Sequence, residues 1–416
     1  MLGTTRSPLL SATFVALVAG QGISLFGNTM LRFAISMWVL DATGSSTAFA
    51  AILAISVMPT VVIGPFGGVL ADRINRRTMM VGLDVLSGIV TLLSLIWIAR
   101  MGFSITVIAG MQIILAVLDA LETPTVQAAL PQMFKRHGAG TLRQGMAVIN
   151  QVQQLSNLMP SFIGGILYAF FGIRLMTAAT VLCFVAAAIV ECRIRLEPPH
   201  AESDGERQPS PIADLRNAFL FLTHEQPALF RLVALCAWLN FILVGFSSIS
   251  FPFIVRTTLG FSAAVYGTCD GIVGIAGIAG TFAAGMFATR LHARHASMSL
   301  WFEGLLMLPP AVSFMMPVSA WTRLLVLTGC LAAGMIAVDF LNLIIFPTIQ
   351  FKTPESMTGK VMALITSVAT CTQPLGQMVY GWLHEWLPVW LILVCSALAI
   401  LPFAVMARPM FDNLES

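Results

Sequence analysis

Charged side chains are scarce in this chain of 416 residues: Asp, Glu, Lys and Arg together make up 10% of it, against about 25% in soluble globular domains. So few charges leave too little polar surface to cover water-facing domains of this size. The net charge is +3, which gives no broad positive field for nucleic acid. The composition therefore excludes a soluble globular protein and a partner made of nucleic acid.

Sequence patterns typical of metal sites and of disulfide frameworks are lacking as well. The seven cysteines lie in or at the end of apolar stretches and form no CxxC pair, so we interpret them as small core residues. The six histidines fall in predicted loops or helix ends, which leaves no histidine at membrane depth as a ligand or a base. No G-x-S-x-G run is present either. We therefore expect no metal, no cofactor and no enzyme active site.

Long apolar runs dominate what remains, since 57% of the residues are hydrophobic. A membrane-spanning helix needs about 20 apolar residues. Segmentation on that length predicts twelve spans: 12–39, 48–70, 78–99, 103–126, 145–170, 173–192, 228–253, 263–287, 297–316, 322–347, 360–382 and 388–407. The fold class is therefore an all-α membrane protein with twelve transmembrane helices.

An internal repeat divides these helices into two halves. GGVLADRINRR (67–77) aligns without gaps with AGMFATRLHAR (284–294) at an offset of 217, and QGMA (144–147) resembles KVMA (360–363) at an offset of 216. Two pseudo-symmetric six-helix halves follow. We place the N-terminal half at 1–193, a flexible polar cytoplasmic linker at 194–227 and the C-terminal half at 228–416.

Basic residues set the predicted orientation in the bilayer. Placing the N-terminus inside puts seventeen of the 22 Lys and Arg residues on the cytoplasmic side and four outside, with Arg32 inside the first helix. This strong asymmetry predicts a multi-pass protein with both termini in the cytoplasm.

The loop after the second predicted span carries an unusual charge pattern. Asp72 lies at the carboxyl end of one helix, and Arg76 and Arg77 lie near the amino end of the next, so their charges oppose the helix dipoles. Local helix stability does not explain them. With Arg73, they are either gating residues with partners elsewhere on the cytoplasmic face or topology signals that touch anionic lipid.

This loop, Gly68 to Arg77, resembles the G-x-L-A-D-R-x-x-R-R signature of the major facilitator superfamily. The first third of the chain is similar to the macrolide-efflux-type branch of proton-linked drug exporters in GQGISLFGNTMLRFAI (20–35), DATGSS (41–46) and the Asp84 of MVGLD. The resemblance implies a two-state transporter in a bacterial cytoplasmic membrane, with a central site between the halves. It also implies that Asp72 makes a cytoplasmic gate contact in the outward-facing form.

Charges inside the membrane are functional candidates, because each costs at least about 2.5–3.5 kcal/mol at bilayer depth. The candidates are Arg32, Asp84, Asp119, Glu122, Asp270 and Asp339. Glu191 and Glu303 lie within a turn or two of the predicted cytoplasmic interface, where a structural role is expected.

Asp119 and Glu122 are three residues apart and share a helix face. The repeat offset maps Glu122 onto Asp339, and the resemblance implies that both helices line the central cavity. Desolvated carboxyl groups there can hold a proton near neutral pH, and competition between that proton and a cationic substrate is sufficient for antiport. The alternative for each acid is a hydrogen bond to a neighbouring helix.

Arg32 and Asp270 lie at similar depth from the outer ends of their helices. We favour a structural or gating ion pair between them, extended by Asn28, over an anion-binding role for Arg32, because an unpaired guanidinium is costly there. Asp84 lies within two turns of Arg76 and Arg77, and we expect it to pair with them.

These features predict a secondary active exporter of a lipophilic, cationic small molecule by proton antiport and alternating access. The partners are then the substrate, protons and the lipid bilayer, and we expect a monomer. The alternative is a transporter of the same fold for a lysophospholipid, a siderophore or another anionic amphiphile bound by Arg32. A sensor that does not transport would have no need for acids in both halves.

Overall fold

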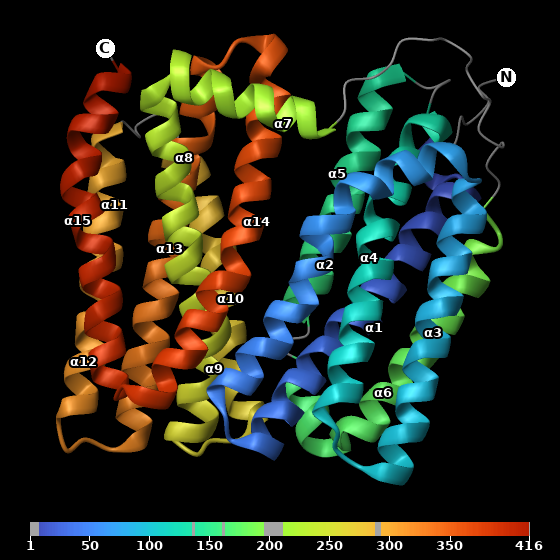
Figure 1. Ribbon diagram of the computed structural model, residues 1–416, viewed down its shortest axis with the longest axis horizontal. Coiled ribbons are helices and arrows are strands. Elements are labelled where there is room, and N and C mark those ends of the chain that lie inside the picture. Colours follow the sequence, from blue (N-terminus) through green and yellow to red (C-terminus); the bar gives the residue numbers. More distant parts are fainter. Residues whose placement is uncertain (1–7, 135–137, 160–162, 195–210, 288–292, 416) are drawn as a thin grey trace, which may run out of the picture. The chain divides into compact units, whose positions relative to one another are not determined.

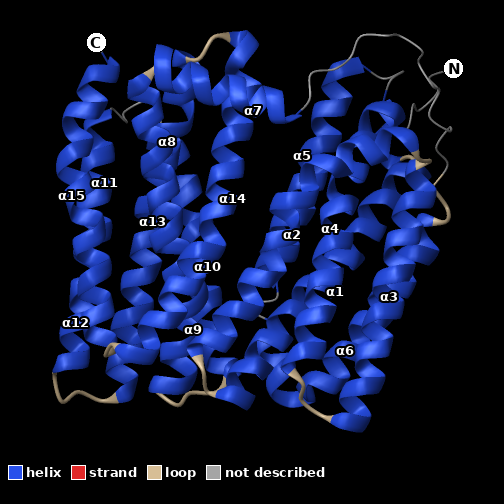
Figure 2. Ribbon diagram, viewed as in Figure 1, coloured by secondary structure: helices blue, strands red, loops and turns tan. Residues whose placement is uncertain are grey.

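The computed structural model describes the chain except for residues 1–7, 135–137, 160–162, 195–210, 288–292 and 416, and except for the side chains of residues 8, 61, 64–73, 138–139, 157–158, 211–215, 293–294, 355–356 and 407–415. The described residues contain helices and turns and no strand (Figure 2). The chain forms two compact units. Unit 1 comprises residues 1–43 and 55–206, and unit 2 comprises residues 44–54 and 207–416.

Unit 1 contains the helices of the N-terminal part of the chain (Figure 1). After a short 3₁₀ turn, η1 (Pro8–Leu10), they are α1 (Ala12–Thr43), α2 (Ser46–Arg73), α3 (Arg76–Met101), α4 (Ile105–Phe134), α5 (Gly138–Met159) and α6 (Gly165–Glu191). Helix α2 begins in unit 2, because its residues 46–54 pack there. Helices α1 and α3 both lie against α6, and α3 also lies against α4.

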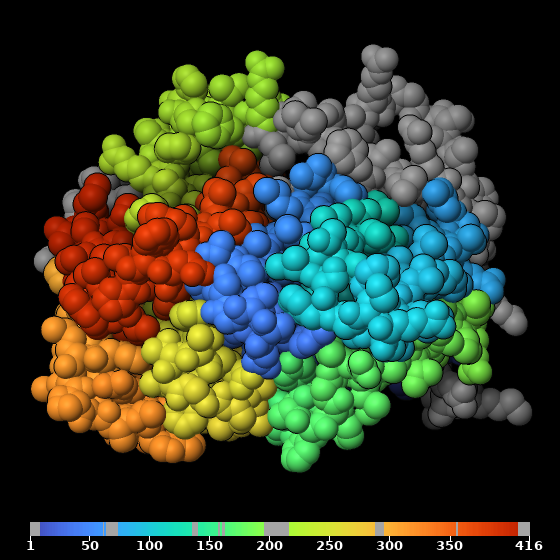
Figure 3. Space-filling model, turned by 60° about the horizontal axis from the view of Figure 1, so that its bottom comes forward, coloured from blue at the N-terminus to red at the C-terminus, as the bar shows by residue number. Residues whose placement is uncertain are grey.

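Unit 2 contains the remaining helices. They are α7 (Pro211–Leu220), η3 (Phe221–Glu225), α8 (Pro227–Leu239), η4 (Asn240–Val244), η5 (Phe246–Ser250), α9 (Phe251–Phe253), η6 (Ile254–Thr258), α10 (Ala263–Phe287), α11 (Ala293–Leu306), α12 (Leu308–Met315), α13 (Ala320–Lys352), α14 (Glu355–Trp386) and α15 (Val389–Glu415). Helix α11 packs on α15 and α13, and α10 packs on α13. The turns between η6 and α10 and between α12 and α13 lie at the same end of this unit (Figure 1). Figure 3 shows the yellow and orange segments side by side on the face that is turned forward.

Nine helices in the described part of the chain are long and apolar enough to cross a bilayer. Large apolar side chains project outward from several of them, including Leu182 at 70% exposure, Phe282 at 73% and Met286 at 81%. A water-soluble protein would not expose such side chains along its helices, whereas the hydrocarbon core of a membrane solvates them. The prediction of an all-α membrane protein is confirmed, and the count of twelve spans stays a prediction.

The helices differ from the predicted spans in several places, through an additional helix, a break, π-helical turns and a kink. Part of the expected flexible linker is helical, since α7 begins at Pro211, where the fixed φ of proline favours a first helical turn. The span 297–316 is divided at Met307 between α11 and α12. The helix from Pro227 to Thr258 is continuous but contains π-helical turns, η4 to η6. Helix α6 contains a kink at Gly172, whose φ of 65° favours glycine.

Aromatic packing closes one end of unit 1. Phe14 of α1 and Phe134 of α4 meet edge to face with ring centroids 5.2 Å apart, a favoured geometry for aromatic pairs. Both are almost fully buried together with Met80 of α3. This cluster fixes α1, α3 and α4 side by side, and it therefore positions the polar residues that lie further along the same helices.

In unit 2, the first turn of α2 is held by the carboxyl end of α14. The Glu385 carboxylate accepts hydrogen bonds from Ser45 Oγ at 2.7 Å and from the backbone N–H of Thr47 at 3.3 Å. Ser46 Oγ donates to the Gly381 carbonyl at 2.8 Å. A carboxylate at a helix amino end satisfies free N–H groups and complements the helix dipole. Consequently, the hydrogen bond from Ser45 and then that from Thr47 lower the pKa of Glu385.

The neighbouring His384 should make stability depend on pH. Burial lowers the pKa of His384 from its usual value near 6.5 to about 4, and the ring packs on Phe253. Because the unfolded chain then binds more protons than the folded protein, stability falls as the pH drops from about 6.5 to about 4, by at most about 1.4 kcal/mol per pH unit.

Thermal unfolding of the purified protein across this range measures the effect. His384→Phe should flatten the dependence between pH 6.5 and pH 4. Glu385→Gln is the matched control, because the lowered pKa of Glu385 gives stability that is lost only below its ordinary value near 4.5. An unchanged profile in His384→Phe would show that the buried ring is not the titrating group.

Candidate functional site

An ion pair joins two of the predicted membrane charges inside unit 1. Arg32 Nη2 of α1 lies 3.6 Å from Asp119 Oδ2 of α4, and the side chains are 32% and 24% exposed. The structure thus gives Arg32 a partner that the sequence reasoning did not assign to it. The expected pair of Arg32 with Asp270 joins residues of different units and stays a prediction.

Three acids from three other helices converge on one turn of α1. Ser24 Oγ donates a hydrogen bond of 2.6 Å to Asp84 Oδ1 of α3. Glu191 of α6 packs on Gly20, where an added Cβ would lie 2.5 Å from the Glu191 Cγ. Glu122 of α4 has Gln21 beside it, and its electrostatic neighbours include Asp84 and Glu191. Residues 20–24 of α1 are therefore the common wall of an acidic cluster, Asp84, Glu122 and Glu191.

This acidic cluster is buried and incompletely hydrogen-bonded. Asp84 and Glu191 are 0% exposed and Glu122 is 5% exposed. Asp84 Oδ2, Glu122 Oε1 and both carboxylate oxygens of Glu191 make no hydrogen bond, and neither does the Gln21 amide. Asn28 lies one turn beyond Ser24 on α1 and is also buried. A buried ionised carboxylate without partners is costly, so these carboxyl groups are suited to hold protons.

The two described arginines of the signature loop bind other groups than Asp84. Arg76 Nη1 donates to Gln132 Oε1 of α4 at 3.0 Å, and Arg77 Nη2 donates to the Cys192 carbonyl at the end of α6. The prediction that Asp84 pairs with these arginines is wrong, because Asp84 points into the helix bundle and binds Ser24 instead. Arg77 satisfies a carbonyl that the end of α6 leaves free.

The other two residues of the predicted gate, Asp72 and Arg73, have side chains outside the described residues. Their gating contact therefore stays a prediction.

The acids of unit 2 have different surroundings. Asp339 of α13 is partly buried against α10, where an added Cβ on Gly280 would lie 2.6 Å from its Oδ2. Glu303 of α11 is 5% exposed and packs on Gly334 of α13. Asp270 lies on α10 and is partly buried. The sequence-equivalent acids Glu122 and Asp339 are thus unlike: one belongs to an acidic cluster, and the other lies in a helix–helix contact.

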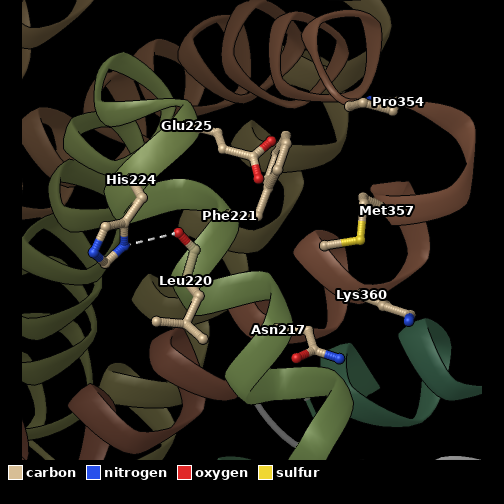
Figure 4. A pocket seen from close by; sticks show the side chains of 8 residues that line it. All are labelled: Asn217, Leu220, Phe221, His224, Glu225, Pro354, Met357 and Lys360. Atoms are coloured by element: carbon tan, nitrogen blue, oxygen red, sulfur yellow. Dashed lines mark hydrogen bonds between the residues drawn. The ribbon is translucent and has the colours of Figure 1, made fainter.

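A cavity of about 710 Å³ lies elsewhere in unit 2, between η3 and the start of α14. Figure 4 shows Phe221 and Glu225 facing the segment that carries Pro354 and Met357. The residues lining it include none of the predicted site residues. Within the described part of the chain, no group of three or more His, Cys, Asp or Glu side chains has the geometry of a metal site.

Sequence reasoning identified Asp119, Glu122 and Asp84 as candidates but not the α1 residues that contact them. Gln21 and Ser24 are three apart in an apolar helix, and polar residues at that spacing share a face. This spacing was the sequence signal for a polar contact on α1. Glu191 was assigned to the interface because it ends its helix, but the close approach of α6 to Gly20 buries it.

Comparison with known proteins agrees with this architecture. Macrolide efflux protein A of Streptococcus pyogenes is 22% identical over 367 residues, which cover 87% of each chain. Multidrug efflux pump Tap of Mycolicibacterium fortuitum is 25% identical over 393 residues, covering 92% of this chain and 90% of Tap. The crystal structure of a D-xylose–proton symporter superposes with a TM-score of 0.69 at 15% identity, covering 96% and 98% of the two chains.

A family model gives the assignment. Residues 17–377 match the model described as the Major Facilitator Superfamily, which spans both units. The match includes α1, α3, α4 and the end of α6, the segments that form the acidic cluster. The chain therefore belongs to the Major Facilitator Superfamily and is a membrane transporter, not an enzyme.

Proposed function

We propose that this protein exports a lipophilic, cationic small molecule in exchange for protons, by alternating access. It acts as a monomer in a bacterial cytoplasmic membrane with both termini in the cytoplasm. The names of two relatives, a macrolide efflux protein and a multidrug efflux pump, support outward transport of drug-like molecules. The asymmetric distribution of Lys and Arg supports the orientation.

The observation that carries the proposal is the surroundings of Glu122. This side chain is 5% exposed at membrane depth, and its Oε1 makes no hydrogen bond. Its electrostatic neighbours are the acids Asp84, Glu191 and Asp119. A carboxyl group in such surroundings favours either a proton or a cation. Exchange of one for the other is the chemical step that an antiporter needs.

The Arg32–Asp119 pair favours a cation over an anion as the substrate. Asp119 already compensates the charge of Arg32, so an anionic amphiphile would have to displace a carboxylate that is covalently part of α4. A cation can instead bind at Asp119, because the acids of this region, Asp119 and the cluster around Glu122, outnumber the single nearby arginine. The alternative of an anionic substrate therefore requires Arg32 to leave Asp119.

Transport into inside-out vesicles tests the coupling. With an imposed pH gradient, the parent should accumulate a fluorescent lipophilic cation such as ethidium. Glu122→Gln should reduce gradient-driven accumulation on the order of tenfold or more, as expected when a proton-transferring group is removed. Asp339→Asn tests the predicted partner acid in unit 2.

Glu303→Gln is the matched control, because Glu303 is equally buried but is not part of the acidic cluster. It should retain gradient-driven accumulation. Full accumulation in the double variant Glu122→Gln/Asp339→Asn would contradict proton coupling through these residues.

A further inference from the structure

We propose that Asp84, Glu122 and Glu191 form one shared proton-binding site, separate from the Arg32–Asp119 pair, and that this site releases protons when a cation binds at Asp119. The inference rests on the proposed antiport and assigns the two steps to different residues. Asp119 receives the cation, and the acidic cluster stores the protons.

The geometry makes the three carboxyl groups a single site. They come from three helices, yet each lies against the same turn of α1: Asp84 on Ser24, Glu191 on Gly20 and Glu122 beside Gln21. Gly20 makes room for this arrangement, since an added Cβ would lie 2.5 Å from Glu191 Cγ and 3.0 Å from Glu191 Oε1 and would push that side chain away. The structure thus includes a specific gap in α1 that a carboxylate side chain fills.

Incomplete hydrogen bonding favours the protonated form of these carboxyl groups. Four carboxylate oxygens and both polar atoms of the Gln21 amide are buried without a hydrogen bond. Ionised, the three acids would form a buried cluster of negative charge, which is far more costly than one unpaired charge. Among the described residues, the charged groups that act on Glu122 are Asp84, Glu191 and Asp119. Arg32 acts on Asp119.

Helix α4 connects the acidic cluster to the ion pair. Asp119 and Glu122 are three residues apart on α4, hence on one face of the helix. Pro124 follows them in the same helix and has no N–H, so this turn of α4 lacks one backbone hydrogen bond. A cation bound at Asp119 adds positive charge next to Glu122 and favours its ionised form. A proton then leaves the acidic cluster for water, and the net charge of the occupied site is conserved.

Three shared carboxyl groups also allow more than one proton to be exchanged for each cation. The proton-binding steps of such a cluster are properties of the three interacting carboxyl groups together and not of any one residue. Replacing one member should therefore change the titration of the remaining two. Replacing Glu303 in unit 2 should not, because no charged group of the acidic cluster acts on that carboxyl group.

Proton release on binding of tetraphenylphosphonium tests the proposal. This probe carries a permanent charge, so every proton released into weakly buffered solution comes from the protein. The parent should release protons, and Glu191→Gln and Asp84→Asn should each release roughly one proton fewer per bound cation. Glu303→Gln should match the parent. Unchanged release in both cluster variants, or an equal loss in Glu303→Gln, would overturn the proposal.

A second measurement does not depend on the substrate. The infrared carbonyl band of protonated carboxyl groups, followed against pH in the protein without substrate, reports the acidic cluster directly. Glu191→Gln should remove part of the band and change the pH at which the rest disappears, whereas Glu303→Gln should only remove intensity. If tetraphenylphosphonium does not bind the parent, the proposal of a cationic substrate is contradicted. The pH dependence of this infrared band then tests the shared proton site by itself. Independent titration of the three carboxyl groups would overturn the shared site.

Discussion

Gly376→Ala should destabilise the protein by roughly 1–3 kcal/mol, the usual cost of overpacking, and at the upper end of that range. Gly376 lies on α14, and its Cα faces the backbone carbonyl of Phe241 in η4. An added Cβ would overlap the Phe241 oxygen, and its distance to the Phe241 carbonyl carbon would be 3.0 Å. Because the obstacle is backbone and not a flexible side chain, one of the two helices must move.

Gly359→Ala is the matched control on the same helix. No atom lies within 4 Å of the position that its Cβ would take, so this substitution should stabilise α14 by up to about 1 kcal/mol, the helix-propensity difference between glycine and alanine. Thermal unfolding of both variants in the same detergent measures the contrast. Equal midpoints for the two variants would mean that α14 and η4 do not approach as closely as the structure places them.

The same contact lies in the irregular part of the helix from Pro227 to Thr258. Gly245 packs reciprocally on α14, with its added Cβ 2.8 Å from the Gly376 carbonyl carbon. Two glycines that face each other let the backbones of membrane helices approach closely. The π-helical turns η4 and η5 flank Gly245, and such turns occur often where a helix is adjusted for function. Substitutions at this contact should therefore change transport as well as stability.

The helical fold could be predicted because it depends on properties that a sequence shows directly. Apolar runs of membrane length, such as 263–287, coincide with a helix, α10, since a backbone in lipid must satisfy its hydrogen bonds internally. The helix breaks at Met307 and the π-helical turns of η4 were not predictable in this way. Both features depend on which helices pack against each other. Apolar composition does not identify the neighbours, because a helix buried in a membrane bundle is apolar on every side.

The candidate site could be predicted only in part, for a similar reason. The cost of a charge in the membrane identified Arg32, Asp119 and Glu122, and they do lie within one unit. Their partners were not predictable, because spacing along one helix gives the shared face but not the neighbouring helix. Depth in the membrane suggested Asp270 for Arg32, and only the contact between α1 and α4 shows that Asp119 is a partner of Arg32.

Asp119→Asn should cost about 2.5–3.5 kcal/mol, because it leaves the Arg32 guanidinium at membrane depth without its counter-ion. Arg32→Gln should cost less, since the remaining carboxyl group can be neutralised by a proton whereas a guanidinium cannot lose one. The double variant Arg32→Gln/Asp119→Asn contains neither charge and should recover most of the stability lost in Asp119→Asn. Thermal unfolding of the four proteins completes the double-mutant cycle.

The same four proteins separate the two substrate classes. If Asp119 binds the cation, both proteins that lack this carboxylate should bind tetraphenylphosphonium weakly, even when the double variant is stable. If Arg32 binds an anion, Arg32→Gln should lose an anionic amphiphile such as a lysophospholipid while Asp119→Asn retains it. Stability losses that simply add would show that the 3.6 Å contact between Arg32 and Asp119 contributes no coupling energy.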